Sequence, residues 1–403
     1  MTILLSDNVI SSFGFTTEAN YLKVKQGVCG LQKFEGRFDL PEPFIASEID
    51  SAQLDEAFAK VNDDYLEVID DYVHPNLQEE YKAAKYGIRY TKLEKACIVS
   101  IADALKRTNI VLGKNDIYFI LSTTKGNITL LDENERGKFK QEQMYLWRSA
   151  EIISNFFGFF FDYYVVSNAC VSGASALIAA QRELRSKRVK YVIATGVDVL
   201  SKFVISGFQS FKALSQEPCK PFDASRTGLN IGEAVATMIL TERKTDDCKS
   251  GDIELTTGAM FNDANHISGP SRLGEGSYCA LKRVLKGIDS DEIGFINAHG
   301  TATPYNDEME SVALTRAGLK DVPVNSLKGY LGHTLGAAGV LESVLSVQAL
   351  KEGTILKTLG CETPGVTSPL DIVLENRETT KKRFVKMLSG FGGGNTALLF
   401  TKL

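Results

Sequence analysis

The sequence predicts an α/β protein in which helices cover the strands of a sheet. Stretches rich in β-branched and aromatic residues alternate with stretches in which apolar residues recur at helical spacing. This alternation is typical of sheets with helices packed on their faces. The chain of 403 residues is also long enough for one large core or two fused ones.

Each expected element can be placed from these patterns. Buried strands are expected at DIYFILSTT (116–124), VKYVIATGV (189–197), AVATMILTE (234–242), EIGFINAHG (292–300) and TALLFTKL (396–403). Amphipathic helices are expected at EKACIVSIADALKR (94–107) and GASALIAAQRELRSKR (173–188). The acidic stretch 50–72 has a helical pattern and is interpreted as a solvated face.

An internal repeat relates the two parts of the chain. CVSGASALIAAQREL is echoed by HTLGAAGVLESVLSVQAL, which pairs Cys170 with His333 and Gly173 with Gly336. IYFILSTTKGN is echoed by IGFINAHGTAT, and GEAVATMILTE by GGGNTALLFTK, in the same order. Because repeated segments predict repeated structure, we expect two pseudo-symmetric halves, 1–247 and 248–403, that pack together.

Composition and charge argue against several classes of protein. The formal net charge of −5 disfavours a general surface for nucleic acid or for an anionic membrane. No stretch reaches the roughly 20 apolar residues of a bilayer span, and the N-terminus lacks a signal-peptide pattern. The seven cysteines include no C-x-x-C pair, as in a reducing compartment. We therefore expect a cytoplasmic protein with no membrane span and no nucleic-acid partner.

Cys170 lies in VVSNACVSGASALIAA, where an apolar strand pattern stops and a helix of small residues starts. A side chain at a helix N-terminus meets unpaired N–H groups equivalent to roughly +0.5 charge. That field favours a thiolate and is expected to lower the pKa of the cysteine. Gly173 and Ala174 would leave room for a substrate. From this segment alone, an activated nucleophile and a buried structural cysteine both stay open.

Two of the four histidines follow predicted strands in glycine-rich loops. His299 lies in NAHGTATPYNDEMES, and His333 lies in NSLKGYLGHTLGAAG, with Lys328 just upstream. Either histidine alone would fit a hydrogen-bonded structural residue. Since Cys170, His299 and His333 all occupy strand-end turns in related segments, together they predict a joint Cys/His/His site.

At these residues the sequence resembles the β-ketoacyl-acyl carrier protein synthases, elongating condensing enzymes of the thiolase superfamily. The matching motifs run in the family's order from about Ser122 onward. They are NACVSG around Cys170, PFDASRTGLNIGEA from Pro221, HGTATPYND from His299, KGYLGHTLGAAG from Lys328 and GFGGGN from Gly390. The resemblance implies a thiolase-like layered αβαβα fold. It also implies a homodimer, or a heterodimer with a related synthase-like subunit.

The resemblance further implies a division of labour in decarboxylative Claisen condensation. Cys170 would hold the acyl chain as a thioester, and His299 and His333 would stabilise the enolate left when malonyl-carrier protein loses CO₂. The backbone N–H groups of Cys170 and Phe391 would form the oxyanion hole, and the Phe391 ring would gate the acyl pocket. A supporting charged network would comprise Lys328, Asp307, Glu310 and Glu342.

Residues for substrate delivery follow from the same resemblance. Thr301 and Thr303 would hydrogen-bond the phosphopantetheine arm, and His266 and Ser268 would lie near the entrance of the active site. Lys212 would help to dock the acyl carrier protein. No metal or nucleotide motif is found, so we expect no bound cofactor, because phosphopantetheine arrives on the carrier.

Several alternatives are weighed against this interpretation. A thiolase needs a second cysteine in LSGFGGGN, and an initiating condensing enzyme usually has Asn in place of one His. A non-catalytic, chain-length-type partner subunit typically lacks the nucleophile, and a Cys/His hydrolase would need a third orienting group. Three features depart from the family pattern. Gly394 stands at a position that is commonly Thr, and Asn168 and the aromatic stretch FFGFFFDYYVV before Cys170 are also unusual. Chain length, pathway and the choice between homodimer and heterodimer stay open.

Overall fold

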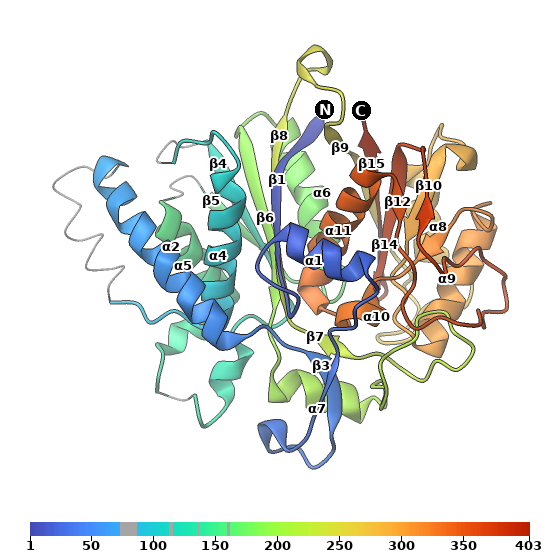
Figure 1. The fold of residues 1–403 in the computed structure, drawn as a ribbon, viewed down its shortest axis with the longest axis horizontal. Helices are drawn as coiled ribbons and strands as arrows, with labels where there is room; N and C mark the ends of the chain where they lie inside the picture. The colour runs from blue at the N-terminus through green and yellow to red at the C-terminus, as the bar shows by residue number, and fades with distance from the viewer. Residues whose placement is uncertain (73–86, 113–115, 136, 159–161) are drawn as a thin grey trace.

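The computed structural model describes residues 1–403 except 73–86, 113–115, 136 and 159–161. Helices and strands are arranged in five layers, which Figure 1 shows from left to right. The two central helices are α6 (Ser172–Arg185) and α11 (Ala338–Glu352). The outer helices are α2 (Ser51–Tyr72), α4 (Lys92–Lys106) and α5 (Leu146–Phe157) on one side, and α8 (Glu275–Val284) and α9 (Pro304–Arg316) on the other. The layers follow the predicted α-β-α-β-α order.

The strands that separate the central helices from the outer helices form one ten-stranded sheet. In spatial order they are β11 (Val324–Asn325), β10 (Ile293–Asn297), β14 (Arg383–Gly390), β15 (Gly394–Lys402), β9 (Ile253–Asn262), β1 (Thr2–Ile10), β8 (Ala234–Glu242), β6 (Tyr191–Asp198), β4 (Ile117–Ser122) and β5 (Asp162–Val166). The two halves of this sheet join through a single residue pairing, Ile3 with Glu254. The sheet wraps the central helices, since α6 contacts β6 and β9 while α11 contacts β8 and β14.

The two halves of the sheet have the same topology. In one, β1 and β8 are antiparallel, β8 and β6 are antiparallel, and β4 is parallel to β6 and to β5. In the other, β9, β15, β14, β10 and β11 repeat that order with the same directions. The predicted boundary at 247/248 falls in the connection between β8 and β9. This correspondence is what an internal repeat predicts.

Smaller elements complete the chain. Helices α1 (Thr17–Lys25), α7 (Lys202–Ser210) and α10 (Lys328–Leu331) connect or cover the main layers. Strands β2 (Gln32–Phe34), β3 (Phe44–Ser47) and β7 (Ile231–Gly232) form a small sheet, and β12 (Thr354–Ile355) pairs with β13 (Arg377–Glu378). Within the described ranges, no helix has both the length and the apolar character needed to cross a membrane.

All of the strands and helices expected from the patterns are present, with small shifts at their ends. The start of α4 shows a local cause: the Thr91 hydroxyl accepts the Glu94 N–H, and the Glu94 carboxylate accepts the Thr91 N–H. This reciprocal cap satisfies two N–H groups that the first turn leaves free. In FFGFFFDYYVV, residues 159–161 lie outside the described part, and β5 begins at Asp162.

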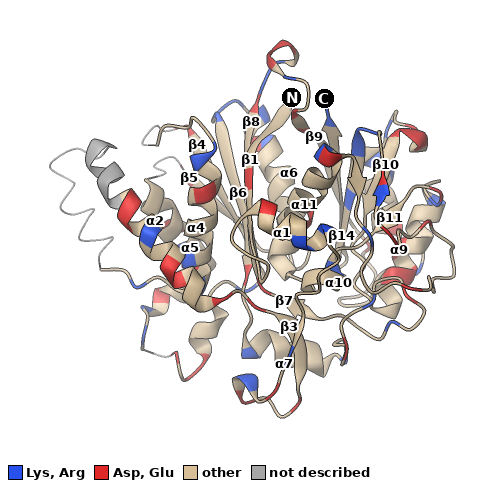
Figure 2. Cartoon of the chain, viewed as in Figure 1, with Lys and Arg blue, Asp and Glu red and all other residues tan. Residues whose placement is uncertain are grey.

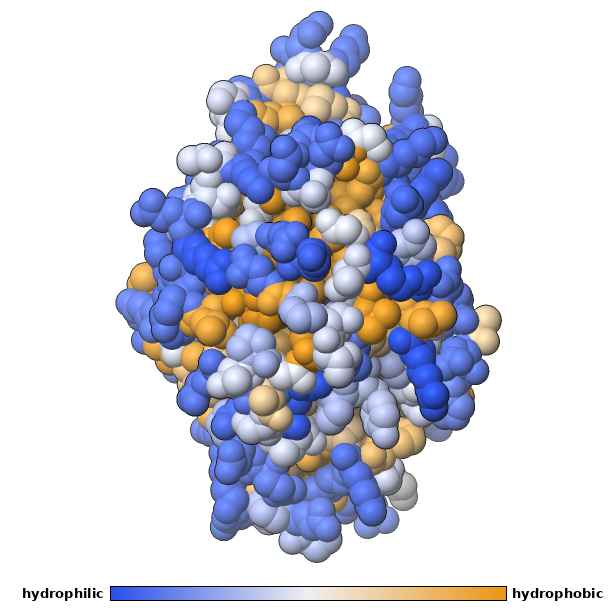
Figure 3. All heavy atoms as spheres, turned by 90° about the vertical axis from the view of Figure 1, so that its right-hand side faces the viewer, coloured by the Kyte–Doolittle hydropathy of each residue, from blue (hydrophilic) through white to orange (hydrophobic). Residues whose placement is uncertain are grey.

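Charge and hydropathy follow the layers. Charged residues mark the outer helices, including α2, whereas the strands are mostly uncharged (Figure 2). The polar face of α2 is solvated as predicted, with Lys60 and Glu56 paired at 2.8 Å on it, whereas Leu54, Val61 and Tyr65 of the same helix are buried. On the face that carries α8 and α9, hydrophilic side chains surround a band of apolar ones (Figure 3). The outer helices therefore present polar faces to solvent, as amphipathic helices do.

One detail of the repeat differs from the prediction. α6 begins directly after the turn at Cys170, whereas a 3₁₀ turn, Leu335–Ala337, separates His333 from α11. The glycines that occupy the second position of each helix are therefore Gly173 and Gly339. The predicted pairing of Gly173 with Gly336 is wrong by this extra turn, because the helices align on Gly339.

Candidate active site

Cys170 lies in a tight turn between β5 and α6. Ala169, directly before it, has φ of 44°, a left-handed conformation that non-glycine residues rarely adopt. The Ser172 hydroxyl secures this turn, accepting the Asn168 N–H at 2.8 Å and donating to the Ala169 carbonyl at 2.6 Å. The turn holds Cys170 at the start of α6, buried but lining a pocket. Its predicted location at the helix start is therefore confirmed.

His333 comes from the turn before α11, in the other half. Its backbone pairs with the segment at β7, where its N–H donates to the Asn230 carbonyl at 2.7 Å and its carbonyl accepts the Gly232 N–H. The Nδ1 atom accepts the Leu335 N–H at 3.3 Å, which places the ring proton on Nε2. That buried Nε2 has no hydrogen-bond partner among the described residues. His333 therefore offers an unused N–H donor.

His299 lies in the loop between β10 and α9. Two carboxylates of α9 hold this loop: Glu310 accepts the N–H groups of His299 and Gly300, each at 2.7 Å, and Asp307 accepts that of Thr301 at 2.9 Å. Pro304 begins α9, where its missing N–H costs no hydrogen bond. Within the part of the chain that the structure describes, the buried Nδ1 of His299 has no hydrogen-bond partner. The spacing of HGTATPYND therefore lets carboxylates of α9 accept the N–H groups of the loop that carries His299.

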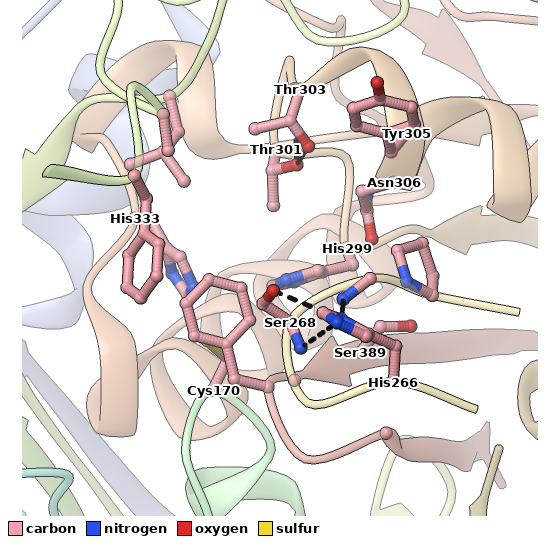
Figure 4. A pocket seen from close by; sticks show the side chains of 18 of the residues that line it. Cys170, His266, Ser268, His299, Thr301, Thr303, Tyr305, Asn306, His333 and Ser389 are labelled. Atoms are coloured by element: carbon pink, nitrogen blue, oxygen red, sulfur yellow. Dashed lines mark hydrogen bonds between the residues drawn. The ribbon is translucent and has the colours of Figure 1, made fainter. Parts of the chain in front are cut away.

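The three predicted groups meet at one point. The two imidazole rings have centroids 5.0 Å apart at 80° to each other. The sulfur of Cys170 and a nitrogen of each ring all lie within 4.8 Å of one another. Figure 4 shows their side chains converging on the same space. Such a trio can surround one small reacting group, and its donor types are also those that zinc accepts.

A pocket of about 350 Å³ leads to this trio. Thr301 and Thr303 lie along one wall, with their hydroxyls 2.8 Å apart, and His266 and Ser268 lie along another (Figure 4). Residues not predicted from the sequence also line it: Tyr305, Asn306, Ser389 and Asn395. Tyr305 and Asn306 lie within HGTATPYND and Asn395 lies within GFGGGN, so these motifs carried a signal that was not used, whereas Ser389 lies just outside them.

Burial governs protonation in the trio. It raises the pKa of the Cys170 thiol to about 11, although the Lys328 ammonium and the Phe391 N–H both favour the thiolate. The expected lowering of this pKa is therefore wrong for the free pocket, because desolvation outweighs the nearby positive charges. Burial, with help from Lys328, also lowers the pKa of His299 and His333 well below 6.5. At neutral pH the site holds a thiol and two neutral imidazoles.

Phe391 stands at the edge of the pocket and is 39% exposed. Its ring contacts Phe208 and Phe211, with centroids 6.0 and 5.7 Å away. The next two residues, Gly392 and Gly393, have φ of 87° and 80°, so the loop depends on glycine. The Phe391 N–H donates a hydrogen bond to the sulfur of Cys170, and Gly390 packs near the Cys170 N–H. The Phe391 N–H therefore lies beside the sulfur, and the Cys170 N–H lies beside Gly390 of the same glycine loop.

The four supporting charges are buried behind the pocket. Lys328 pairs with Glu342 at 2.6 Å, and both side chains are essentially inaccessible. Burial raises the pKa of Asp307 to about 6 and that of Glu310 to about 7. Sequence reasoning missed Lys386, which contacts the other oxygen of Glu342 at 2.5 Å. Its signal was a charged residue in the middle of the apolar strand RFVKMLSG.

Lys212 lies on the surface beside the pocket, between the lining residues Phe211 and Ala213. Sequence reasoning also missed Asp198, a buried carboxylate that links the two halves. Asp198 accepts the Gly336 N–H at 2.7 Å, the Thr124 N–H at 2.9 Å and the Thr123 hydroxyl at 2.8 Å. Since Gly336 follows His333, this contact ties the His333 segment to the loop after β4.

Comparison with known proteins agrees with this geometry. Residues 13–246 match the family model of the β-ketoacyl synthase N-terminal domain, and residues 254–362 match that of the C-terminal domain. The chain is 31% identical over 255 residues to 3-oxoacyl-[acyl-carrier-protein] synthase 2 of Vibrio cholerae. That match covers 59% of this chain and 62% of the relative.

Two solved structures share the fold over the whole chain. They are the ishigamide ketosynthase/chain length factor, at 20% identity, and the ketosynthase ApeO in complex with its chain length factor ApeC from Xenorhabdus doucetiae, at 22%. Both have a TM-score of 0.82, and both matches cover 100% of this chain. They cover 99% of the ishigamide chain and 98% of the ApeO–ApeC chain. The chain therefore belongs to the β-ketoacyl synthase family and has the thiolase-like fold that its sequence predicts.

Proposed function

We propose that this chain is a β-ketoacyl-acyl carrier protein synthase, an acyltransferase that performs decarboxylative Claisen condensation in fatty acid, polyene or polyketide biosynthesis. The observation that carries the proposal is the meeting of Cys170, His299 and His333 within 4.8 Å at the end of a pocket. Family membership supports the same reaction. It also favours a carrier-bound substrate over a metal ion as the group that these three residues surround.

The first half-reaction transfers an acyl chain to Cys170. The sulfur attacks the thioester carbonyl of the acyl carrier, the bond to the pantetheine sulfur breaks, and the thiol proton leaves with that sulfur. The thiol must lose this proton during attack, because burial keeps the free group protonated. The N–H groups of Cys170 and Phe391 stabilise the oxyanion of the tetrahedral species.

The second half-reaction uses the imidazoles. A malonyl thioester loses CO₂, and the electron pair of the broken C–C bond forms an enolate whose oxygen accepts N–H groups from His299 and His333. The enolate carbon then attacks the acyl-cysteine carbonyl, and the C–S bond to Cys170 breaks. Neutral imidazoles suit this role, because each keeps one N–H to donate.

Substrate handling and assembly are part of the proposal. Thr301 and Thr303 bind the phosphopantetheine arm, His266 and Ser268 border the entrance, and Lys212 docks the acidic carrier protein. The chain acts as a homodimer or as a heterodimer with a related synthase-like subunit, without a bound cofactor. The unpaired state of all seven cysteines supports a cytoplasmic location. A non-catalytic chain-length-type subunit is the alternative, which the complete Cys/His/His trio disfavours.

Intact-mass spectrometry with a panel of acyl-carrier proteins tests the proposal. The unaltered protein should gain one acyl group, Cys170→Ala should gain none, and Cys279→Ser should behave like the unaltered protein. His299→Ala and His333→Ala should retain most of the acyl loading but lose CO₂ release from malonyl-carrier protein. Loading that survives in Cys170→Ala would exclude the assigned nucleophile.

A further inference from the structure

Lys386 is a buried ionisable side chain, and the reaction proposed above gives it no role. It lies in the middle of β14, fully buried, and does not line the pocket. Glu342 is shared between two cations, with Lys328 Nζ at 2.6 Å from Oε1 and Lys386 Nζ at 2.5 Å from Oε2. Lys328 and Glu342 alone would already be a neutral pair. Burying a second ammonium costs free energy that its ion pair and hydrogen bonds must offset.

The remaining contacts of Lys386 point toward His299. Its ammonium donates to the carbonyls of Ala298 at 3.1 Å and Asn297 at 3.4 Å, the two residues directly before His299. On the other side, Glu310 accepts the N–H of His299 and that of Gly300. The backbone around His299 is thus held from both directions, by a cation on its carbonyls and by an anion on its N–H groups.

The charge of Lys386 also reaches the imidazoles. Together with Lys328, it disfavours a proton on either His299 or His333, after the larger effect of burial. A fixed positive charge behind two neutral donors also lowers the energy of negative charge that develops in front of them. An enolate oxygen is such a charge.

We propose that Lys386 is a positioning residue for the malonyl half-reaction. It anchors the carbonyls before His299 and places a second positive charge behind both imidazoles, with Glu342 as the shared counter-ion. The inference rests on the proposed function, because it assigns Lys386 to the step in which an anion forms. It makes the decarboxylation step, and not acyl transfer to Cys170, the step that depends on this lysine.

Two substitutions separate the charge from the hydrogen bonds. Lys386→Met removes both, whereas Lys386→Gln removes the charge but keeps an amide that can donate to a carbonyl. Lys402→Met is the matched control, since Lys402 lies on the neighbouring strand β15 and its ammonium contacts an exposed carbonyl of Lys351. Melting temperature is recorded for each variant to establish that it folds.

Acyl loading on Cys170 is followed by intact mass, and CO₂ release from malonyl-carrier protein is followed across pH. Both Lys386 variants should load acyl chains within about threefold of the unaltered protein. CO₂ release should fall at least tenfold in Lys386→Met and less in Lys386→Gln. In both variants, the acid limb of the pH profile of CO₂ release should move to higher pH, because an imidazole that loses a neighbouring cation is protonated more readily. Lys402→Met should change neither rate.

Unchanged CO₂ release and an unchanged pH profile in either folded variant would overturn the inference. Equal losses of loading and CO₂ release would also overturn it, because they would indicate a general structural role. The proposed function fails separately, if the unaltered protein itself neither loads an acyl chain nor releases CO₂.

Discussion

Gly173 and Gly339 lie in direct backbone contact where α6 meets α11. A Cβ on Gly339 would lie 2.2 Å from the nitrogen of Ala174, and one on Gly173 would lie 2.9 Å from the Cα of Gly339. This contact brings together the two helices whose preceding turns carry Cys170 and His333. The distance between the sulfur of Cys170 and the imidazole of His333 therefore depends on the absence of a side chain at both glycines.

Gly339→Ala should separate these helices and impair the site. We expect a loss of about 1–3 kcal/mol in the free energy of unfolding, the usual range for overpacking a core. Condensation should fall further than this loss of stability explains, because the sulfur and imidazole move apart. Denaturant unfolding and turnover measure the two effects. Gly207→Ala in α7 is the control, since its Cβ would meet open space and Ala favours a helix.

Cys170 should react faster as pH rises. Burial raises its pKa to about 11, so the thiolate fraction should grow about tenfold per pH unit between pH 7 and pH 9. Iodoacetamide labelling followed by peptide mapping gives the rate for Cys170 itself, separate from the exposed Cys29. A plateau below pH 8 would contradict this expectation. It would mean that the helix field and Lys328 outweigh desolvation.

Phe391→Ala should leave the fold intact and change substrate loading. The ring is 39% exposed and packs against the rings of Phe208 and Phe211 at the edge of the pocket, so its loss creates no deep cavity. Acyl-loading rate and chain-length preference should both change if the ring gates the pocket. The exposed Phe203, which does not line this pocket, provides the control as Phe203→Ala. Identical loading kinetics and selectivity would remove the gate from the mechanism.

Gly392→Ala tests the hinge of that gate without touching the ring. A side chain there would meet open space, but the φ of 87° is strained for alanine. Loading should therefore slow through the backbone alone, by an amount that a stopped-flow assay can measure. Loading at the unaltered rate would show that the loop does not need this conformation during the reaction.

Lys212→Glu should weaken docking of an acidic carrier protein. Lys212 is exposed beside the pocket, so reversal of its charge should raise KM for the carrier about three- to tenfold with little change in kcat. The effect should shrink at high salt, because exposed charges are screened. Lys282→Glu, exposed on the outer helix α8, should leave KM unchanged. Equal effects of the two variants would point to net charge and not to a docking position.

The sequence by itself determined the class of fold, the places of strands β4, β6, β8, β10 and β15 and of helices α4 and α6, and the candidate Cys/His/His trio. Periodicity reports which side chains are buried, and the motifs around Cys170, His299 and His333 are local, so neither needs distant residues to be interpreted. The repeat also predicted matching halves. Its helix register failed at Gly336, where a 3₁₀ turn before α11 has no counterpart before α6.

Only the tertiary structure decided the protonation of the site and the groups behind it. The helix-start position of Cys170 predicts a lowered pKa, but burial by both halves raises it, and desolvation depends on what the whole fold packs around the sulfur. Lys386 is near Glu342 in space yet distant from it in the chain, so no local pattern links them. Charges interact through space, and only the packing of β14 against α11 makes that pair.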